Sequence, residues 1–190
     1  MKRTCALLVL ISLTTGCAFT SHQVNLNVTQ PAIVPAAVAT ATTLRLRVVD
    51  ERDQADLGHR GAGIAAAKVT AEGVINTFTA AVEDGFRKKG YTLTTDPTNA
   101  NAELVVSLRA LKFGESTGFF TVGAEADAAI LAEARRGTED YRNQYRASDE
   151  DRQFAISFGG GIDEQINLVL NKTLAQLFND RNLDDFLTRK

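Results

Sequence analysis

Cysteine and histidine are scarce in this chain of 190 residues, which contains two of each. Cys5 and Cys17 both lie close to the N-terminus, and His22 and His59 both lie in the first third of the chain. The remainder therefore offers no thiol for a disulfide or a thiolate metal site and no imidazole to activate a nucleophile. We predict no catalytic residue set, no metal site and no cofactor.

The chain also lacks a large excess of positive or negative charge. The chain has 21 Lys and Arg residues against 23 Asp and Glu, a formal net charge of −2. Loss of Lys2 and Arg3 with a cleaved leader changes this value to −4, because −2 − 2 = −4. Binding to nucleic acid or to anionic lipid headgroups calls for basic patches, so the composition predicts neither as a partner.

The apolar run near the N-terminus is short. It spans Cys5 to Leu13 (CALLVLISL), well below the about 20 residues that cross a bilayer. Lys2 and Arg3 precede it, and small residues lead from it to Cys17. This arrangement is typical of an export signal that ends at a lipid-modified cysteine. We predict that residues 1–16 are a cleaved signal peptide and that Cys17 carries the lipid.

Lipidation of Cys17 would anchor the protein firmly, because two acyl chains already suffice for stable membrane attachment. Ala18 follows the cysteine where an aspartate would favour retention in the inner membrane, so we expect the outer membrane of a Gram-negative bacterium, facing the periplasm. Thr14 stands where an aliphatic residue is usual in such signals. The alternative is an ordinary cleaved signal beside an incidental cysteine.

Residues 18–43 contain no Asp, Glu, Lys or Arg. We interpret residues 17–43 as the lipidated N-terminus and a flexible tether, whose 26 uncharged residues would span about 28 Å root-mean-square. The alternation of Val24, Leu26 and Val28 leaves open a short strand that docks on the domain.

Residues 44–190 are predicted to form one α+β domain with two layers, in which two helices cover one face of an antiparallel meander. We expect a loop at residues 50–63 and a turn at residues 114–118. We expect Asp163 to be the N-cap of the last long helix and residues 159–161 to form a hinge before that helix. The predicted strands are 44–49, 91–95, 102–113, 119–135 and 139–148, and the predicted helical segments are 72–89, 163–179 and 183–187.

Several stretches resemble the YajG-like family of outer-membrane lipoproteins. They are Gly16-Cys17, Lys88-Lys89-Gly90-Tyr91, Glu103 to Ala110, the Ala-rich stretch Ala124 to Gly137, and Tyr145-Arg146-Ala147-Ser148 with Phe154 beyond it. The resemblance covers nearly the whole chain in order. It implies a lipid-anchored single α+β domain, and it supplies no catalytic residues.

Gly114 to Gly118 matches the G-x-S-x-G pattern of a nucleophile elbow. That device needs a strand-to-helix turn with an acid and then a histidine further along the chain. Both histidines precede Ser116. We therefore interpret the motif as a hairpin turn.

Tyr141-Arg142 and Tyr145-Arg146 repeat at an interval of four residues. On a strand, this spacing places both tyrosines on one face and both arginines on the other. Arginine side chains on an exposed strand suit carboxylates or phosphates. These four residues are our candidate binding surface; the alternative is a polar sheet face with tyrosines packed inward. The open face is expected to carry Ser107, Arg109, Glu125, Asp127, Arg142 and Arg146.

The leading hypothesis is a non-enzymatic lipoprotein whose domain binds another envelope component, with a protein favoured over a polymer. One alternative is an envelope hydrolase that uses Glu125 and Asp127, which would lie about 7 Å apart on one strand face. Another is a carrier that holds a hydrophobic ligand between the sheet and the helices, over the Ala-rich strand.

Overall fold

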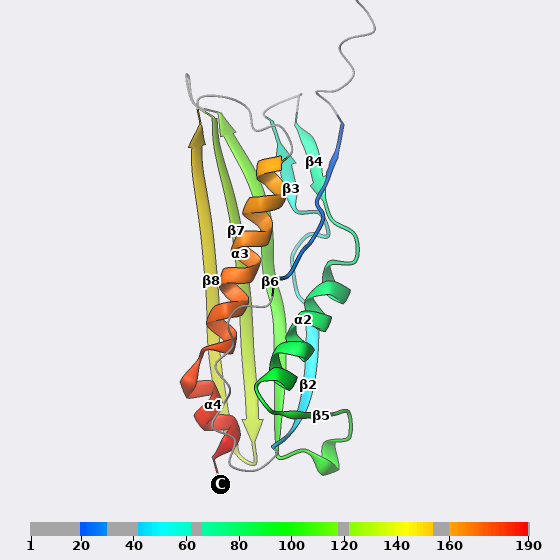
Figure 1. The fold of residues 1–190 in the computed structure, drawn as a ribbon, viewed down its shortest axis with the longest axis vertical. Coiled ribbons are helices and arrows are strands. Elements are labelled where there is room, and N and C mark those ends of the chain that lie inside the picture. The colour runs from blue at the N-terminus through cyan, green and yellow to red at the C-terminus, as the bar shows by residue number, and fades with distance from the viewer. Residues whose placement is uncertain (1–19, 30–41, 62–65, 118–121, 154–159, 190) are drawn as a thin grey trace, which may run out of the picture.

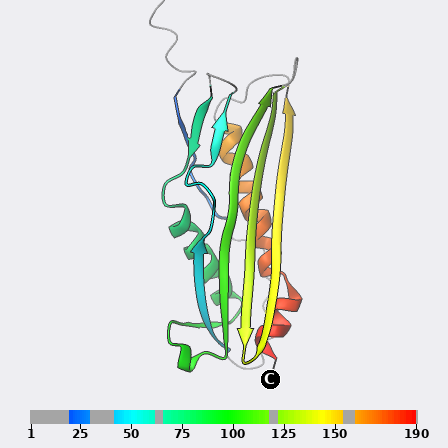
Figure 2. The ribbon, with the colours of Figure 1, turned by 180° about the vertical axis from the view of Figure 1, so that it is seen from behind.

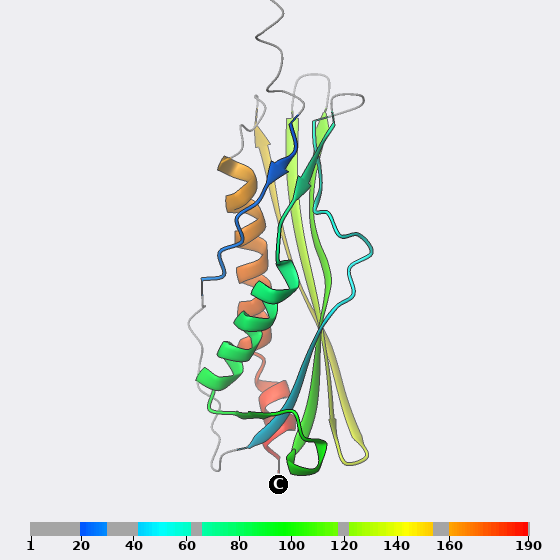
Figure 3. The ribbon, with the colours of Figure 1, turned by 90° about the vertical axis from the view of Figure 1, so that its right-hand side faces the viewer.

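The computed structural model describes residues 20–29, 42–61, 66–117, 122–153 and 160–189. These residues form two layers, a long twisted sheet and a layer of helices on one of its faces (Figures 1 and 3). Figure 2 shows the opposite face of the sheet, which the helices leave open. The predicted α+β class and two-layer arrangement are confirmed.

The described residues form eight strands, a short 3-10 helix and three α-helices. The strands are β1 (His22–Gln23), β2 (Thr43–Asp50), β3 (Gly58–Arg60), β4 (Ala67–Thr70), β5 (Thr92–Thr94), β6 (Ala102–Thr117), β7 (Val122–Arg136) and β8 (Glu139–Gln153). The helices are α2 (Val74–Lys88), η2 (Pro97–Asn99), α3 (Gly160–Phe178) and α4 (Arg181–Thr188).

The sheet is mixed, which corrects the predicted antiparallel meander. Strands β6, β7 and β8 are antiparallel neighbours, as expected. On the other side of β6 the pairing is parallel: β2 runs parallel to both β5 and β6, and β3 runs parallel to β6. The helix α2 lies between β2 and β6 in the sequence. It returns the chain to the end of the sheet where β2 begins, so that β6 starts there too and runs parallel to β2. The sequence prediction overlooked this crossover.

The helix α2 forms where the spacing of apolar residues predicts it. Val74, Phe78, Val82 and Phe86 recur every four residues, and all four are buried against the sheet. Gly90 adopts a φ of 98° just after the helix, and its amide donates to the carbonyl of Arg87. A glycine in this left-handed conformation ends the helix.

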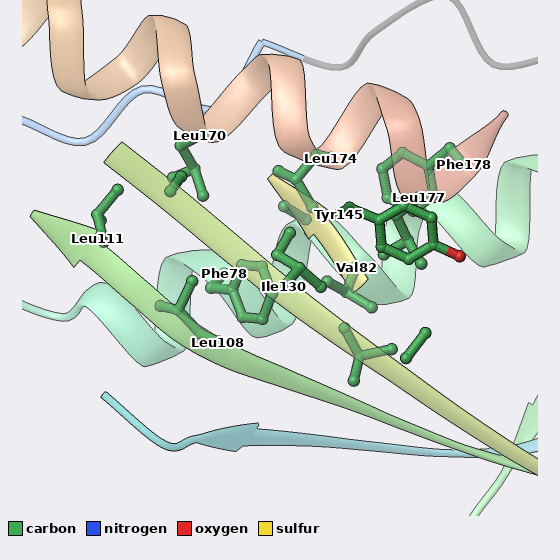
Figure 4. Close-up of a cluster of buried hydrophobic side chains, with 14 of the residues drawn as sticks. Phe78, Val82, Leu108, Leu111, Ile130, Tyr145, Leu170, Leu174, Leu177 and Phe178 are labelled. Atoms are coloured by element: carbon green, nitrogen blue, oxygen red, sulfur yellow. The ribbon is translucent and has the colours of Figure 1, made fainter. Parts of the chain in front are cut away.

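The Ala-rich face of β7 lies directly beneath α3. Ala126, Ala128 and Ile130 are buried on this face, and Leu170 and Leu174 of α3 are buried opposite them (Figure 4). Small side chains allow a helix to approach a sheet closely. The helix itself therefore occupies the space in which a hydrophobic ligand was considered.

A β-bulge interrupts the pairing of β6 with β7. Leu108 pairs with Ile130 and Ala110 pairs with Ala129, so Arg109 is the extra residue. The extra residue reverses the alternation beyond it: Leu111 and Phe113 become buried, and Ala110 and Lys112 lie on the open face. Strict alternation from Leu104, Val106 and Leu108 would place Ala110 on the core face, and the bulge places it on the open face instead.

Residues 20–29 lie against the domain. His22 and Gln23 pair with Val69 and Thr70 of β4, and Val24 is 3% exposed within the hydrophobic core. Beyond Val24 the chain follows α3, whose side chains bind its backbone. Burial alternates from Val24 to Val28 as the sequence suggested, but the strand comprises only His22 and Gln23.

Three further expectations need correction. The expected loop 50–63 contains the strand β3, and β6 continues through Thr117, across most of the expected turn. The helix α3 already includes Gly160 and Gly161, so Asp163 lies in its first turn and is not its N-cap. The predicted helical tail 183–187 is confirmed: it lies within α4, whose N-cap is Asp180.

Candidate binding site

A groove of about 610 Å³ lies on the open face of the sheet. It forms where β2 ends beside β6, because the chain just after Asp50 contributes Glu51 and Asp53 to its lining. The bulge in β6 places Arg109 and Ala110 in the groove, and β7 and β8 complete it. The lining residues are Glu51, Asp53, Arg109, Ala110, Lys112, Asp127, Ala128, Ala129, Gln144, Arg146, Ala147 and Ser148.

The charges in the groove are mixed: three carboxylates (Glu51, Asp53, Asp127) and three cations (Arg109, Lys112, Arg146) line it. Arg109 Nη1 donates to Glu51 Oε2 at 2.7 Å. This hydrogen bond is the main reason why the pKa of Glu51 lies below its ordinary value. Lys112 Nζ lies 3.7 Å from the exposed carboxylate of Asp53. The groove therefore presents both signs of charge at close spacing.

Arg146 and Arg142 are exposed on the open face, as predicted, but they occupy different places. Arg146 lines the groove, and its guanidinium donates to Gln144 Oε1 on the same strand at 3.4 Å. Arg142 lies nearer the start of β8, outside the lining residues, with Nε 3.4 Å from Glu133 Oε1. Of the two arginines, only Arg146 is positioned to contact a molecule in the groove.

Tyr141 and Tyr145 lie on the opposite face, toward the helices, so they do not share a surface with the arginines. Both hydroxyls donate to Asp180 Oδ2, at 2.7 Å and 2.6 Å. Burial, followed by the bond to Asp180, raises the pKa of Tyr141 to about 12 and raises that of Tyr145 further. The candidate set of four is thus corrected: the tyrosines hold α4 on the sheet.

Glu125 and Asp127 both face the open side of β7, where Glu125 is exposed and Asp127 is half-buried. Ser107, expected on this face in contact with water, is only 2% exposed. Sequence reasoning missed Glu51, Asp53 and Lys112 as groove residues, because a loop and a bulge bring them there. The available signal was only that the expected loop 50–63 is rich in charge.

A family model described as "Uncharacterized lipoprotein" (Lipoprotein_16) matches residues 30–188. The chain belongs to this lipoprotein family. The resemblance drawn from the sequence is confirmed at this level. No protein among the curated sequences matches the chain.

Several solved structures are similar to this lipoprotein. Protein XCC0632 from Xanthomonas campestris supports the fold, with a TM-score of 0.54 and 10% identity, covering 89% of this chain and 97% of that one. A putative neuraminyllactose-binding hemagglutinin homolog from Helicobacter pylori matches with a TM-score of 0.48 and 9% identity, over 86% and 97% of the two chains. Lipoprotein GNA1162 from Neisseria meningitidis matches with a TM-score of 0.32 and 10% identity, over 74% and 100%.

Membership of a lipoprotein family agrees with attachment to a membrane of the cell envelope through a lipid. Among the helices in the described part of the lipoprotein, none is long and apolar enough to cross a membrane. The predicted signal peptide and Cys17 lie outside the described residues.

Proposed function

We propose that this lipoprotein is a non-enzymatic, YajG-like outer-membrane protein. In this proposal Cys17 carries the lipid, and the periplasmic domain binds another envelope protein through the groove on its open sheet face. The observation that carries the proposal is the groove itself, with Arg146 and Lys112 at its wall and an ion pair, Arg109 to Glu51, at its edge. The position of Glu125 and Asp127 on an open face favours binding over hydrolysis.

The mixture of charges supports a protein as the partner. Because three carboxylates balance three cations in the groove, a polyanionic envelope polymer gains no net attraction there, whereas a protein surface can present both signs of charge in a matching pattern. Ala110 and Ala129, which pair across β6 and β7, add apolar surface between the charged residues. Apolar surface among charged groups is usual in protein interfaces.

Photocrosslinking in intact cells tests the groove. A photoreactive amino acid at Gln144, which is exposed within the groove, should capture a protein partner and yield a protease-sensitive adduct. The same amino acid at Asp140, exposed on the same strand but outside the groove, should not. An adduct that resists protease would identify a polymer and contradict the proposed partner class.

Replacement of Arg146 provides the matched mutational test. Arg146→Ala removes a groove cation, and we expect adduct formation from position 144 to fall by about tenfold, equivalent to 1.4 kcal/mol. Arg142→Ala removes an arginine from the same strand and face outside the groove and should leave the adduct unchanged. Equal effects of the two substitutions would show that the groove is not the binding surface.

Labelling with radioactive palmitate tests the anchor separately. The wild-type protein should incorporate label and Cys17→Ser should not. Label that persists in Cys17→Ser would exclude Cys17 as the lipidated residue.

A further inference from the structure

Residues 20–29, here called the strap, bind to the domain along their whole length. At one end, Val24 N donates to the carbonyl of Thr70 at 2.7 Å, which extends the pairing of β1 with β4. Arg60 Nη2 donates to the carbonyl of Thr20 at 2.8 Å, so the first described residue is also held. The strap is therefore attached to the sheet where it begins.

Side chains on one face of α3 hold the rest of the strap. Asn167 Oδ1 accepts from Asn27 N at 2.7 Å, and its Nδ2 donates to the carbonyl of Asn25 at 2.9 Å. One turn further, Asn171 Nδ2 donates to the carbonyl of Asn27 at 3.3 Å. An asparagine side-chain amide both donates and accepts hydrogen bonds. Here it supplies the hydrogen bonds that a neighbouring strand would otherwise give to the extended backbone.

Asp163 fixes the strap at the start of α3. Its Oδ1 lies 2.6 Å from His22 Nε2, and its Oδ2 accepts from Asn25 N at 3.3 Å. Asp163, Asn167 and Asn171 recur at every fourth position, so they form one row along the helix. Together with the buried Val24, this row specifies both the path and the register of the strap.

The strap shortens the connection between lipid and domain. Thr20 is three residues after Cys17, and a fully extended chain covers at most about 3.6 Å per residue, or roughly 11 Å in this case. A free tether of 26 residues would instead span about 28 Å. We propose that the strap holds one end of the domain, comprising β1, β3, β4 and the first turn of α3, directly on the membrane surface. This inference rests on the proposed lipidation of Cys17.

The same end of the molecule carries the neighbouring strand ends. Thr117 pairs with Val122 and Val122 with Gln153, while His59 pairs with Gly114 nearby on β6. These strand ends therefore lie at the end of the domain that the strap places on the membrane.

The orientation places the groove at a definite height. From Val122 to Ala129, which lines the groove, β7 rises about 23 Å at about 3.3 Å per residue. The turn between β7 and β8 and the helix α4 lie at the opposite end (Figure 1). A partner in the groove would therefore bind beside the long sheet, about halfway along β7, rather than at the membrane or at the far tip of the domain.

Energy transfer to labelled lipid tests this orientation. The lipidated protein is placed in vesicles of phosphatidylethanolamine and phosphatidylglycerol with a rhodamine-labelled lipid. A donor dye is attached to Lys68→Cys on β4 or to Asp140→Cys at the far end; both positions are exposed. We expect several-fold greater transfer from position 68 than from position 140. Equal transfer from the two positions would overturn the proposal.

Two changes should abolish the difference for distinct reasons. Asn167→Ala with Asn171→Ala removes the side chains that hold the strap, and transfer from position 68 should fall. Asn76→Ala with Asn182→Ala, at exposed positions on α2 and α4, is the matched control and should have no effect. A flexible insertion of roughly twelve residues between Ala18 and Phe19 adds about 20 Å and leaves every strap contact intact.

If the double asparagine variant does not fold, the insertion variant tests the proposal alone, because it changes the length of the connection and no contact of the strap. Loss of transfer from position 68 after the insertion supports the strap as the element that sets the distance. Transfer that persists after the insertion overturns it, because some other contact would then hold the domain on the lipid. Flotation of wild type and Cys17→Ser with the vesicles reports the anchor itself, so failure of the lipidation is seen separately.

Discussion

Asp180 joins strand β8 to helix α4 through one carboxylate. Its Oδ2 accepts from the hydroxyls of Tyr141 and Tyr145 and from Asn143 Nδ2, at 2.6–2.9 Å. Its Oδ1 accepts from the amides of Asn182 and Leu183 and so caps α4. A single residue therefore attaches the last helix to the edge strand β8.

Ionisation of Asp180 links this cluster to pH. Burial acts to raise the pKa of Asp180, but the hydrogen bonds from Tyr145 and Tyr141 outweigh it, so the pKa lies below its ordinary value. The unfolded chain has an aspartate pKa of about 3.9. The ionised carboxylate therefore stabilises the fold above that pH, and its contribution is lost as the pH falls through the lower, folded-state value.

We expect Asp180→Asn to destabilise the protein by about 1–3 kcal/mol at pH 7, because asparagine has one acceptor oxygen where the carboxylate uses two: if that oxygen caps α4, the NH2 group faces the tyrosine hydroxyls. Asparagine still caps a helix, so α4 should form. Urea unfolding should show that the difference from wild type shrinks as the pH falls below about 3.9. Asp185→Asn, at an exposed position of α4, is the control. A difference that stays constant with pH would contradict the linkage.

Lys89 shows how one residue can mislead a prediction from sequence. It is one of two lysines at the end of α2, where a cation suits the negative end of the helix and usually faces solvent. Lys88 does so and pairs with Asp84, but Lys89 is 2% exposed and its Nζ donates to Asp184 and to the carbonyl of Phe178. The partners lie about ninety residues away, beyond the reach of a local pattern.

At the scale of elements, the approach of α2 to α3 depends on one glycine. Gly85 lies in α2 and faces the ring of Phe178 at the end of α3; an added Cβ would lie 2.2 Å from Phe178 Cζ. The ring of Phe178 also packs edge-on against Phe86, with centroids 5.8 Å apart. The two helices can therefore pack together only without a side chain at position 85.

Gly85→Ala should destabilise the protein although alanine is the better helix former. The gain in helix propensity is about 1 kcal/mol, and the overpacking against Phe178 should exceed it, since such changes cost about 1–3 kcal/mol. Thermal unfolding should show a lower midpoint for Gly85→Ala and a partial recovery when Phe178→Leu is added. Asn76→Ala, at an exposed position of α2, should raise the midpoint slightly. A rise for Gly85→Ala would mean that the ring moves without cost.

At the scale of the whole molecule, segments from both ends of the chain complete one core. Val24 near the N-terminus and Leu183 and Leu187 near the C-terminus belong to the same buried cluster as the sheet and α2. The packed part of the domain therefore begins well before Leu44, where the sequence analysis placed its start. The charge-free composition of residues 18–43 did not distinguish a free tether from a segment bound through its backbone.

Val24→Ala should lower the free energy of unfolding by about 2 kcal/mol, because it removes two methyl groups from a closed site. Val28→Ala, at a half-buried position of the same strap, should have a smaller effect. Urea unfolding of the soluble domain with residues 18–190 measures both. If neither substitution changes the free energy of unfolding measurably, Val24 is not packed in the core in solution.

The sequence by itself determined the elements with strong local signals. The apolar spacing of α2, the long strands β6 to β8 with the turn at Gly137, and the opposite facing of Tyr145 and Arg146 all follow from the periods of helix and strand. Tertiary structure decided the rest. The parallel pairing of β2, the bulge at Arg109 and the binding of the strap to α3 depend on partners distant in sequence, and so does the groove on the open face. Local propensity carries no information on such contacts, because their energy comes from hydrogen bonds and burial that exist only once the chain has folded.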